Sequence, residues 1–129
     1  MMHKVSAPGL SERPYFHRYT DDAVDLCDVL SSFTSQGKAT LHEVCRIMGL
    51  PGKPDGMSGA EVEKYYRDGH IIQIAEYCES DVVNTYQFWL RHELFCGKLT
   101  DVAFQARETN LVEFIKARGN TKPHLAGLM

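Results

Sequence analysis

The sequence predicts a mainly α-helical chain of about five helices, on three observations. Apolar residues recur every three or four positions over most of the chain, capping sequences mark the segment boundaries, and no run of alternating residues indicates a strand. At 129 residues, one domain with its own core is expected. We expect an irregular lead-in over residues 1–20, a helical region over residues 21–118 and a tail over residues 119–129.

The first two predicted helices are short. From Asp22 to about Ser32 the apolar positions follow a helical period, and Asp21 or Asp22 is placed to cap the N-terminus. The sequence Thr40–Glu43 matches a capping box, in which the hydroxyl and the carboxylate satisfy free backbone N–H groups. A second helix should therefore begin here and end near Gly49, a natural stop residue.

A loop follows, because Leu50–Gly59 contains three glycines and two prolines, which fit neither a helix nor a central strand. Ser58 and Glu61 repeat the capping-box spacing. They predict a short helix that ends at Asp68–Gly69.

The longest periodic segment runs from His70 to Phe95 and is closed by Gly97. Its apolar residues predict one continuous core face, which we call the apolar stripe: Ile71, Ala75, Cys78, Val82, Tyr86 and Trp89. A last helix should run from Thr100 or Asp101 to Ala117. The tail has little periodicity, although its apolar residues are placed to dock on a neighbouring surface: Leu125, Leu128 and Met129.

Charge and composition exclude several classes of protein. The net charge of −3 argues against a dense basic surface that binds duplex nucleic acid. No apolar run approaches the roughly 20 residues of a membrane helix, so no membrane partner is expected and a cytoplasmic location is the default. The cysteines stand far apart in helical contexts and are expected to be buried free thiols: Cys27, Cys45, Cys78 and Cys96.

Tyr77 and Asp81 are the candidate catalytic residues. Four residues apart on the long helix, they stack at one border of the apolar stripe. A carboxylate at the rim of a buried face is half desolvated, which suits metal ligation, and the phenol could share a hydrogen bond with the same water. The plain alternative is a core-edge tyrosine beside a solvated carboxylate. Tyr-x-x-x-Asp is too short a pattern to decide between them.

The wider sequence decides for a family. Gly69–Tyr86 resembles the third motif of DEDDy 3′–5′ exonucleases, in the form carried by predicted exonucleases related to family-B DNA polymerase proofreading domains. The resemblance covers roughly residues 15–118. It extends in order to Val24–Leu30, Pro51–Pro54, Ser58–Gly59, Arg91–Leu94 and Gly97–Leu99.

This resemblance implies that the chain corresponds to the C-terminal helical part of an α/β ribonuclease-H-like exonuclease fold. In that family four acidic residues hold two Mg²⁺ or Mn²⁺ ions, and a tyrosine helps to position the attacking water. Asp81 would be the last metal-binding carboxylate and Tyr77 the water-positioning phenol. Lys53 would contact phosphate at the 3′ end of a single-stranded nucleic acid, or would be only a solvated cation in a connector.

The sequence departs from the family pattern in its acidic residues. No Asp-x-Glu triplet occurs anywhere, and the second acidic motif is missing ahead of Asp25. One carboxylate supplies at most two of the roughly twelve ligand positions of two octahedral ions. Asp25 and Asp28 could replace the missing ligands, but acidic residues early in a helix are expected from the helix dipole alone. We therefore expect weak metal binding, and little or no activity from this chain alone.

Two functions from different classes follow. In the first, a preceding segment or a partner chain supplies the missing strands and acidic motifs of the exonuclease. In the second, the chain is a non-catalytic helical interaction or oligomerisation module derived from that fold. In either case the apolar stripe lacks a sheet, so it must be covered by the other helices of the chain, repacked into a bundle, or by a second copy in a homo-oligomer. We favour the second copy, because the predicted short helices are too small to replace a whole sheet. Tyr65, Tyr66 and the aromatics around Trp89 are expected to fill a core rather than stack on bases.

Overall fold

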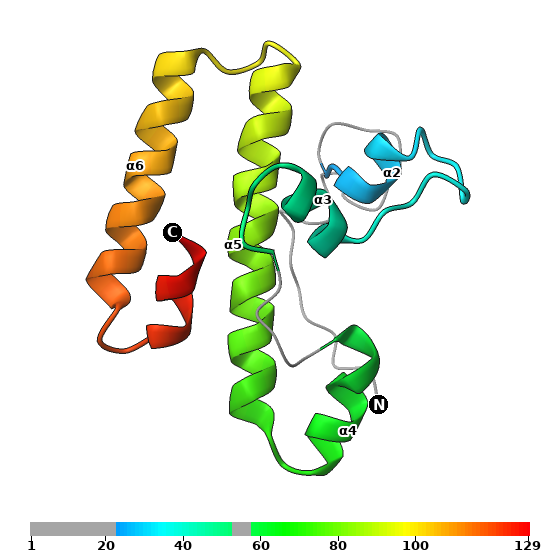
Figure 1. The fold of residues 1–129 in the computed structure, drawn as a ribbon, viewed down its shortest axis with the longest axis vertical. Helices are drawn as coiled ribbons and strands as arrows, with labels where there is room; N and C mark the ends of the chain where they lie inside the picture. Colours follow the sequence, from blue (N-terminus) through cyan, green and yellow to red (C-terminus); the bar gives the residue numbers. More distant parts are fainter. Residues whose placement is uncertain (1–22, 53–57) are drawn as a thin grey trace, which may run out of the picture. The chain divides into compact units, whose positions relative to one another are not determined.

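The computed structural model describes residues 23–52 and 58–129, and within these ranges the chain is helical with no strand. The expected mainly α fold is confirmed. The chain divides into two compact units, residues 1–39 and 40–129, and each is considered by itself. Figure 1 shows the course of the chain. No helix in the described ranges has both the length and the apolar character needed to cross a bilayer.

The described part of the first unit contains one short helix, α2, at Leu26–Leu30. The predicted start at Asp22 is wrong. The carboxylate of Asp25 accepts hydrogen bonds from the backbone N–H groups of Cys27 (2.9 Å) and Asp28 (3.2 Å), so Asp25 is the N-cap, and Ala23 and Val24 directly before it are not helical.

The second unit begins with α3 at Leu41–Ile47, and its predicted capping box is present. The backbone N–H of Thr40 donates to the Glu43 carboxylate at 2.8 Å, and the N–H of Glu43 donates to the Thr40 hydroxyl at 3.2 Å. Gly49 adopts a φ of +70°, a left-handed conformation that favours glycine, so the helix ends where the sequence predicts.

The predicted short helix is confirmed as a 3₁₀ turn, Gly59–Glu61, followed by α4 at Val62–Arg67. The backbone N–H of Ser58 donates to the Glu61 carboxylate at 2.9 Å, as the capping-box spacing predicts. Of the predicted Leu50–Gly59 loop, residues 53–57 lie outside the described residues.

The two longest helices are α5 at Ile71–Phe95 and α6 at Asp101–Arg118, and both agree with the sequence prediction. They run side by side in opposite directions, joined by a short turn (Figure 1). The last residues form a 3₁₀ turn, η2, at Pro123–Leu128, which contacts both helices. The helices α3 and α4 each contact α5, so α5 is the central element of this unit.

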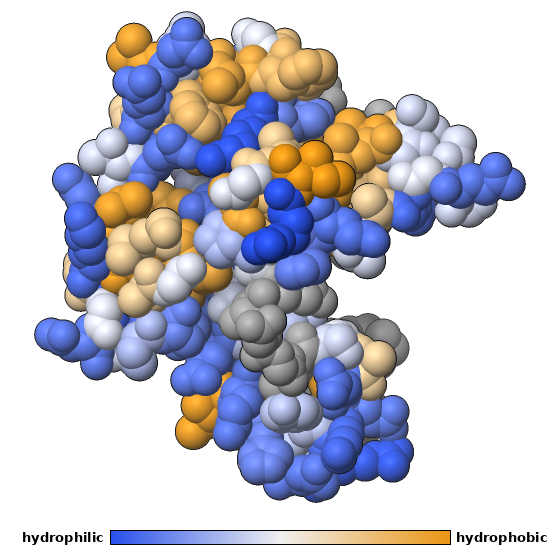
Figure 2. Space-filling view, in the orientation of Figure 1, coloured by the Kyte–Doolittle hydropathy of each residue, from blue (hydrophilic) through white to orange (hydrophobic). Residues whose placement is uncertain are grey.

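A small core forms where η2 meets the α5–α6 pair. It consists of Val83, Ile115, Leu125 and Leu128, with Leu111 packed against it. Burying an aliphatic side chain contributes about 1.5–3 kcal/mol. The apolar tail residues therefore do dock, apart from Met129, which is 53% exposed. Figure 2 shows the apolar surface that gathers over η2 and the adjoining part of α6.

The buried face of α5 is not the predicted apolar stripe. In that stripe Ile71 is 57% and Val82 is 67% exposed, and Ala75 and Cys78 are also exposed. The residues of α5 that are buried are Tyr77, Ser80, Val83, Asn84, Phe88 and Leu90. At about 100° per residue these centre nearly on the opposite side of the helix. The other helices and η2 thus pack on the mixed polar and apolar face and leave the stripe largely uncovered.

Other burial predictions are partly corrected. All four cysteines are free, but only Cys45 is buried. Tyr66 is 69% exposed and fills no core. Trp89 is half-buried, with the ring of Tyr86 stacked at 5.8 Å between centroids and the Arg107 guanidinium from α6 over it at 5.7 Å.

Candidate functional site

The two candidate catalytic residues lie one turn apart on α5. Successive residues rise 1.5 Å and turn about 100°, so Tyr77 and Asp81 lie on one side of the helix, one above the other. Tyr77 is 9% exposed and Asp81 is half-buried. Both sit at the edge of the buried face of α5, and a rigid 25-residue helix fixes their separation along the axis.

The carboxylate of Asp81 has one oxygen that is shielded from solvent without a hydrogen-bond donor in the described part of the chain. The Oδ1 atom of Asp81 is buried, and no donor within the described residues makes a hydrogen bond to it. A buried oxygen without a donor loses its hydration and gains nothing in return, at a cost of about 1–3 kcal/mol. A hard cation or a donor from another group would remove that cost, because carboxylate oxygen is a preferred ligand of Mg²⁺ and Mn²⁺.

The described residues do not complete a two-ion centre around Asp81. Within residues 23–52 and 58–129, no three His, Cys, Asp or Glu side chains lie close enough together to hold a metal ion. Asp25 caps α2, and Asp28 is 3.3 Å from the Lys38 ammonium. Both acidic residues therefore have structural partners, as expected of carboxylates early in a helix rather than of replacement metal ligands.

The chain on both sides of residues 53–57 approaches side chains of α5, at Asn84 and at Tyr77. The Asn84 side-chain amide donates to the carbonyl oxygen of Gly52 at 2.8 Å and to that of Ser80 at 3.0 Å. On the other side, a Cβ atom at Gly59 would lie 4.0 Å from the Tyr77 hydroxyl. Lys53, the candidate substrate contact, lies outside the described residues.

Asn84 was not singled out in the sequence, although it is fully buried and joins α5 to the chain after α3. The available signal was its position three residues after Asp81, on the same side of a helix. Its partner Gly52 has a φ of +70°, and a Cβ there would come within 2.8 Å of the His42 Nδ1 atom. Both the left-handed backbone and the close approach therefore require glycine at this position.

The thiol of Cys45 on α3 lies close enough to this part of α5 to respond to its charges. Burial raises the pKa of the Cys45 thiol; the positive charge of Arg91 lowers it, and the negative charge of Asp81 raises it. This thiol is fully buried and is kept in its neutral form, so it belongs to the packing between α3 and α5.

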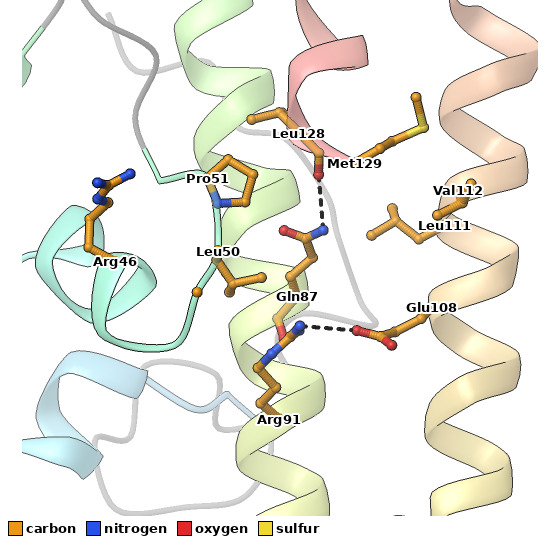
Figure 3. A pocket seen from close by; sticks show the side chains of 11 residues that line it. Arg46, Leu50, Pro51, Gln87, Arg91, Glu108, Leu111, Val112, Leu128 and Met129 are labelled. Atoms are coloured by element: carbon orange, nitrogen blue, oxygen red, sulfur yellow. Dashed lines mark hydrogen bonds and ion pairs between the residues drawn. The ribbon is translucent and has the colours of Figure 1, made fainter.

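A separate cavity of about 620 Å³ opens between the end of α3, α5, α6 and η2 (Figure 3). Neither Tyr77 nor Asp81 lines it. Gln87 donates to the Leu128 carbonyl at 3.1 Å, and Arg91 pairs with Glu108 at 3.2 Å. These polar contacts lie along one side of the cavity, and no sequence pattern predicts them.

Comparison with known proteins gives one result. No curated protein and no solved structure matches the chain. One family model matches residues 10–128, which is nearly the whole length. That family is described as predicted 3′–5′ exonucleases related to the exonuclease domain of PolB. The match covers the helix that carries Tyr77 and Asp81, and the chain belongs to this family of predicted 3′–5′ exonucleases.

Proposed function

We propose that the chain is the C-terminal helical portion of a DEDDy-type 3′–5′ exonuclease domain, which hydrolyses nucleic-acid phosphodiesters. The observation that carries the proposal is the buried Oδ1 atom of Asp81, which has no hydrogen-bond partner among the described residues and lies one turn from Tyr77 on a helix that the family model covers. In this role Asp81 is one ligand of Mg²⁺ or Mn²⁺, and Tyr77 positions the attacking water. Lys53 contacts the 3′ end of a single-stranded substrate.

The chain by itself is inactive in this proposal, because it carries one of the four expected acidic residues. A preceding segment or a partner chain supplies the others. The support for this is the missing Asp-x-Glu sequence, together with the lack of a three-ligand cluster in the described ranges. A single carboxylate binds a divalent ion only weakly, because it fills at most two of the roughly six ligand positions of one octahedral ion.

The test measures Mn²⁺ binding by calorimetry and digestion of a 3′-labelled single strand. The purified chain should bind Mn²⁺ weakly and leave the strand intact. Asp81→Asn should abolish the weak binding, and Asp68→Asn, which removes an exposed carboxylate at the end of α4, should not. Metal-dependent digestion by the pure chain, lost in Asp81→Asn but kept in Asp68→Asn, would show that other residues complete the centre and that the inactivity proposal is wrong.

The second candidate function is a non-catalytic helical interaction or oligomerisation module. The observation that favours it is the uncovered apolar stripe, in which Ile71 and Val82 are more than half exposed. A second copy related by a two-fold axis is the simplest cover, since two-fold symmetry is the commonest closed arrangement of soluble homo-oligomers. Light scattering at micromolar concentration tests it. If the wild-type chain is a dimer and Val82→Glu is a monomer, the oligomerisation module is supported. If the wild-type chain is a monomer, no second copy covers the apolar stripe.

A further inference from the structure

At the C-terminal end of α5, the side chain of His92 contacts both the thiol of Cys96 and the carboxylate of Glu93. The Sγ atom of Cys96 lies 3.6 Å from Nε2 of His92, one turn earlier. The other ring nitrogen of His92, Nδ1, lies 3.6 Å from the Oε1 atom of Glu93. This cluster plays no part in the candidate exonuclease site, since it lies three to four turns beyond Asp81, about 16–22 Å along the helix axis.

The thiol in this cluster is accessible, whereas the groups behind it are shielded. Cys96 is exposed, but the side chains of His92 and Glu93 are only 15% and 16% exposed. The Nδ1 atom of His92 is buried and has no hydrogen-bond partner in the described part of the chain. The imidazole thus lies between the largely shielded carboxylate of Glu93 on one side and the exposed thiol of Cys96 on the other.

The carboxylate decides which ring nitrogen carries the proton. A negative charge beside Nδ1 favours the tautomer with the proton on Nδ1, which leaves Nε2 as an acceptor facing the thiol. Lys98 also lies near Glu93, at 3.7 Å, but its side chain is 59% exposed and is largely hydrated. An acceptor 3.6 Å from a thiol can take its proton, and the thiolate is the form of cysteine that attacks sulfur.

We propose that Cys96 is a thiol-modification site, in which His92 is the general base, Glu93 orients it, and the reaction partner is a small disulfide. The Cys96 proton passes to Nε2 of His92, and the thiolate attacks one sulfur of the disulfide. A new sulfur–sulfur bond joins Cys96 to half of the reagent, the original disulfide bond breaks, and the leaving thiolate takes the proton back from the imidazolium. No further oxidant is consumed.

The chain contains its own controls. Cys78 is also exposed and also lies on α5, but it has no hydrogen-bonded histidine within the described residues. Cys45 is fully buried and reports unfolding, because it reacts only when the structure opens. Two variants isolate the exposed thiols: Cys27→Ser with Cys78→Ser leaves Cys96, and Cys27→Ser with Cys96→Ser leaves Cys78. Both keep Cys45.

The experiment follows the reaction of each variant with dipyridyl disulfide at neutral pH by the absorbance of the released thione. Cys96 should react about tenfold faster than Cys78, because its thiolate is formed by the adjacent base. His92→Gln should reduce the rate of Cys96 to that of Cys78, and Glu93→Gln should reduce it in part. Neither substitution should alter the rate of Cys78 or make Cys45 reactive.

Three results would overturn the proposal. Equal rates for Cys96 and Cys78 would show that the contact with His92 does not make the Cys96 thiol more reactive. An unchanged Cys96 rate in His92→Gln would exclude the general base, and an unchanged rate in Glu93→Gln would exclude the orienting carboxylate. If His92→Gln exposes Cys45, the variant has lost its fold. His92→Asn then provides the same comparison, and a full Cys96 rate in that variant refutes the proposal.

Discussion

Replacing Asn84 with alanine should destabilise the second unit more than a polar-to-alanine substitution at an exposed helix position would. The side chain is fully buried and donates to the Gly52 carbonyl at 2.8 Å. Its removal leaves a buried carbonyl without its donor, which costs about 1–3 kcal/mol. The space left by the amide adds about 1 kcal/mol, and the better helix propensity of alanine returns about 0.5 kcal/mol. The expected net loss is about 1.5–3.5 kcal/mol.

The assay is urea unfolding followed by far-ultraviolet circular dichroism. For a unit of this size such a loss lowers the midpoint by roughly 1–2 M urea. Thr85→Ala is the matched control, because the next residue of α5 is exposed and its replacement should change stability by less than about 0.5 kcal/mol. If Asn84→Ala unfolds within about 0.5 kcal/mol of Thr85→Ala, the Asn84–Gly52 contact does not hold the structure together and the reasoning is refuted.

Three further changes test other contacts of the second unit. Leu90→Ala removes a side chain with 0% exposure and should cost about 2–5 kcal/mol in the same urea assay; a loss below about 1 kcal/mol would contradict its place in the packing. Thr40→Ala removes the capping hydroxyl of α3 and should cost about 0.5–2 kcal/mol, with Thr40→Ser restoring most of it. Glu79→Gln should lower the thermal midpoint at pH 7. The hydrogen bond from Lys122 lowers the pKa of the Glu79 carboxyl from its ordinary value of 4.5, desolvation opposes the shift, and the hydrogen bond with His124 adds to it. Because the folded-state pKa is the lower one, this contribution is present above pH 4.5 and is lost as the pH falls below it, so wild type and Glu79→Gln should converge in acid. A difference that persists unchanged to pH 2 would show that Glu79 acts through its shape and not its charge.

The elements that the sequence predicts well are those with local causes. The capping box at Thr40 and the stop at Gly49 depend on residues within one turn, and both are present. The predicted start of the first helix was wrong because the sequence offers three aspartates that could cap it, at positions 21, 22 and 25. Only the hydrogen bonds of Asp25 show which one succeeds.

Long-range packing was less predictable, because periodicity finds apolar faces without saying which one is covered. In α5 the predicted stripe around Val82 is exposed, whereas the opposite face buries Phe88 and Leu90 together with polar Ser80 and Asn84. A buried asparagine is costly until its partner is known, and that partner, Gly52, is 32 residues earlier in the chain. The placement of Tyr77 and Asp81 on one helix was predictable, since it needs only a spacing of four. The contact between Asn84 and Gly52 was not.

The packing around Trp89 allows tryptophan fluorescence to report on the contact between α5 and α6. The chain has one tryptophan, and its ring contacts Tyr86 of its own helix and the Arg107 guanidinium of α6. Its emission should therefore shift when α6 swings away from α5, even if both helices stay intact, whereas the circular dichroism signal should not. Comparing the two signals during unfolding separates opening of the hairpin from melting of its helices, without any added label.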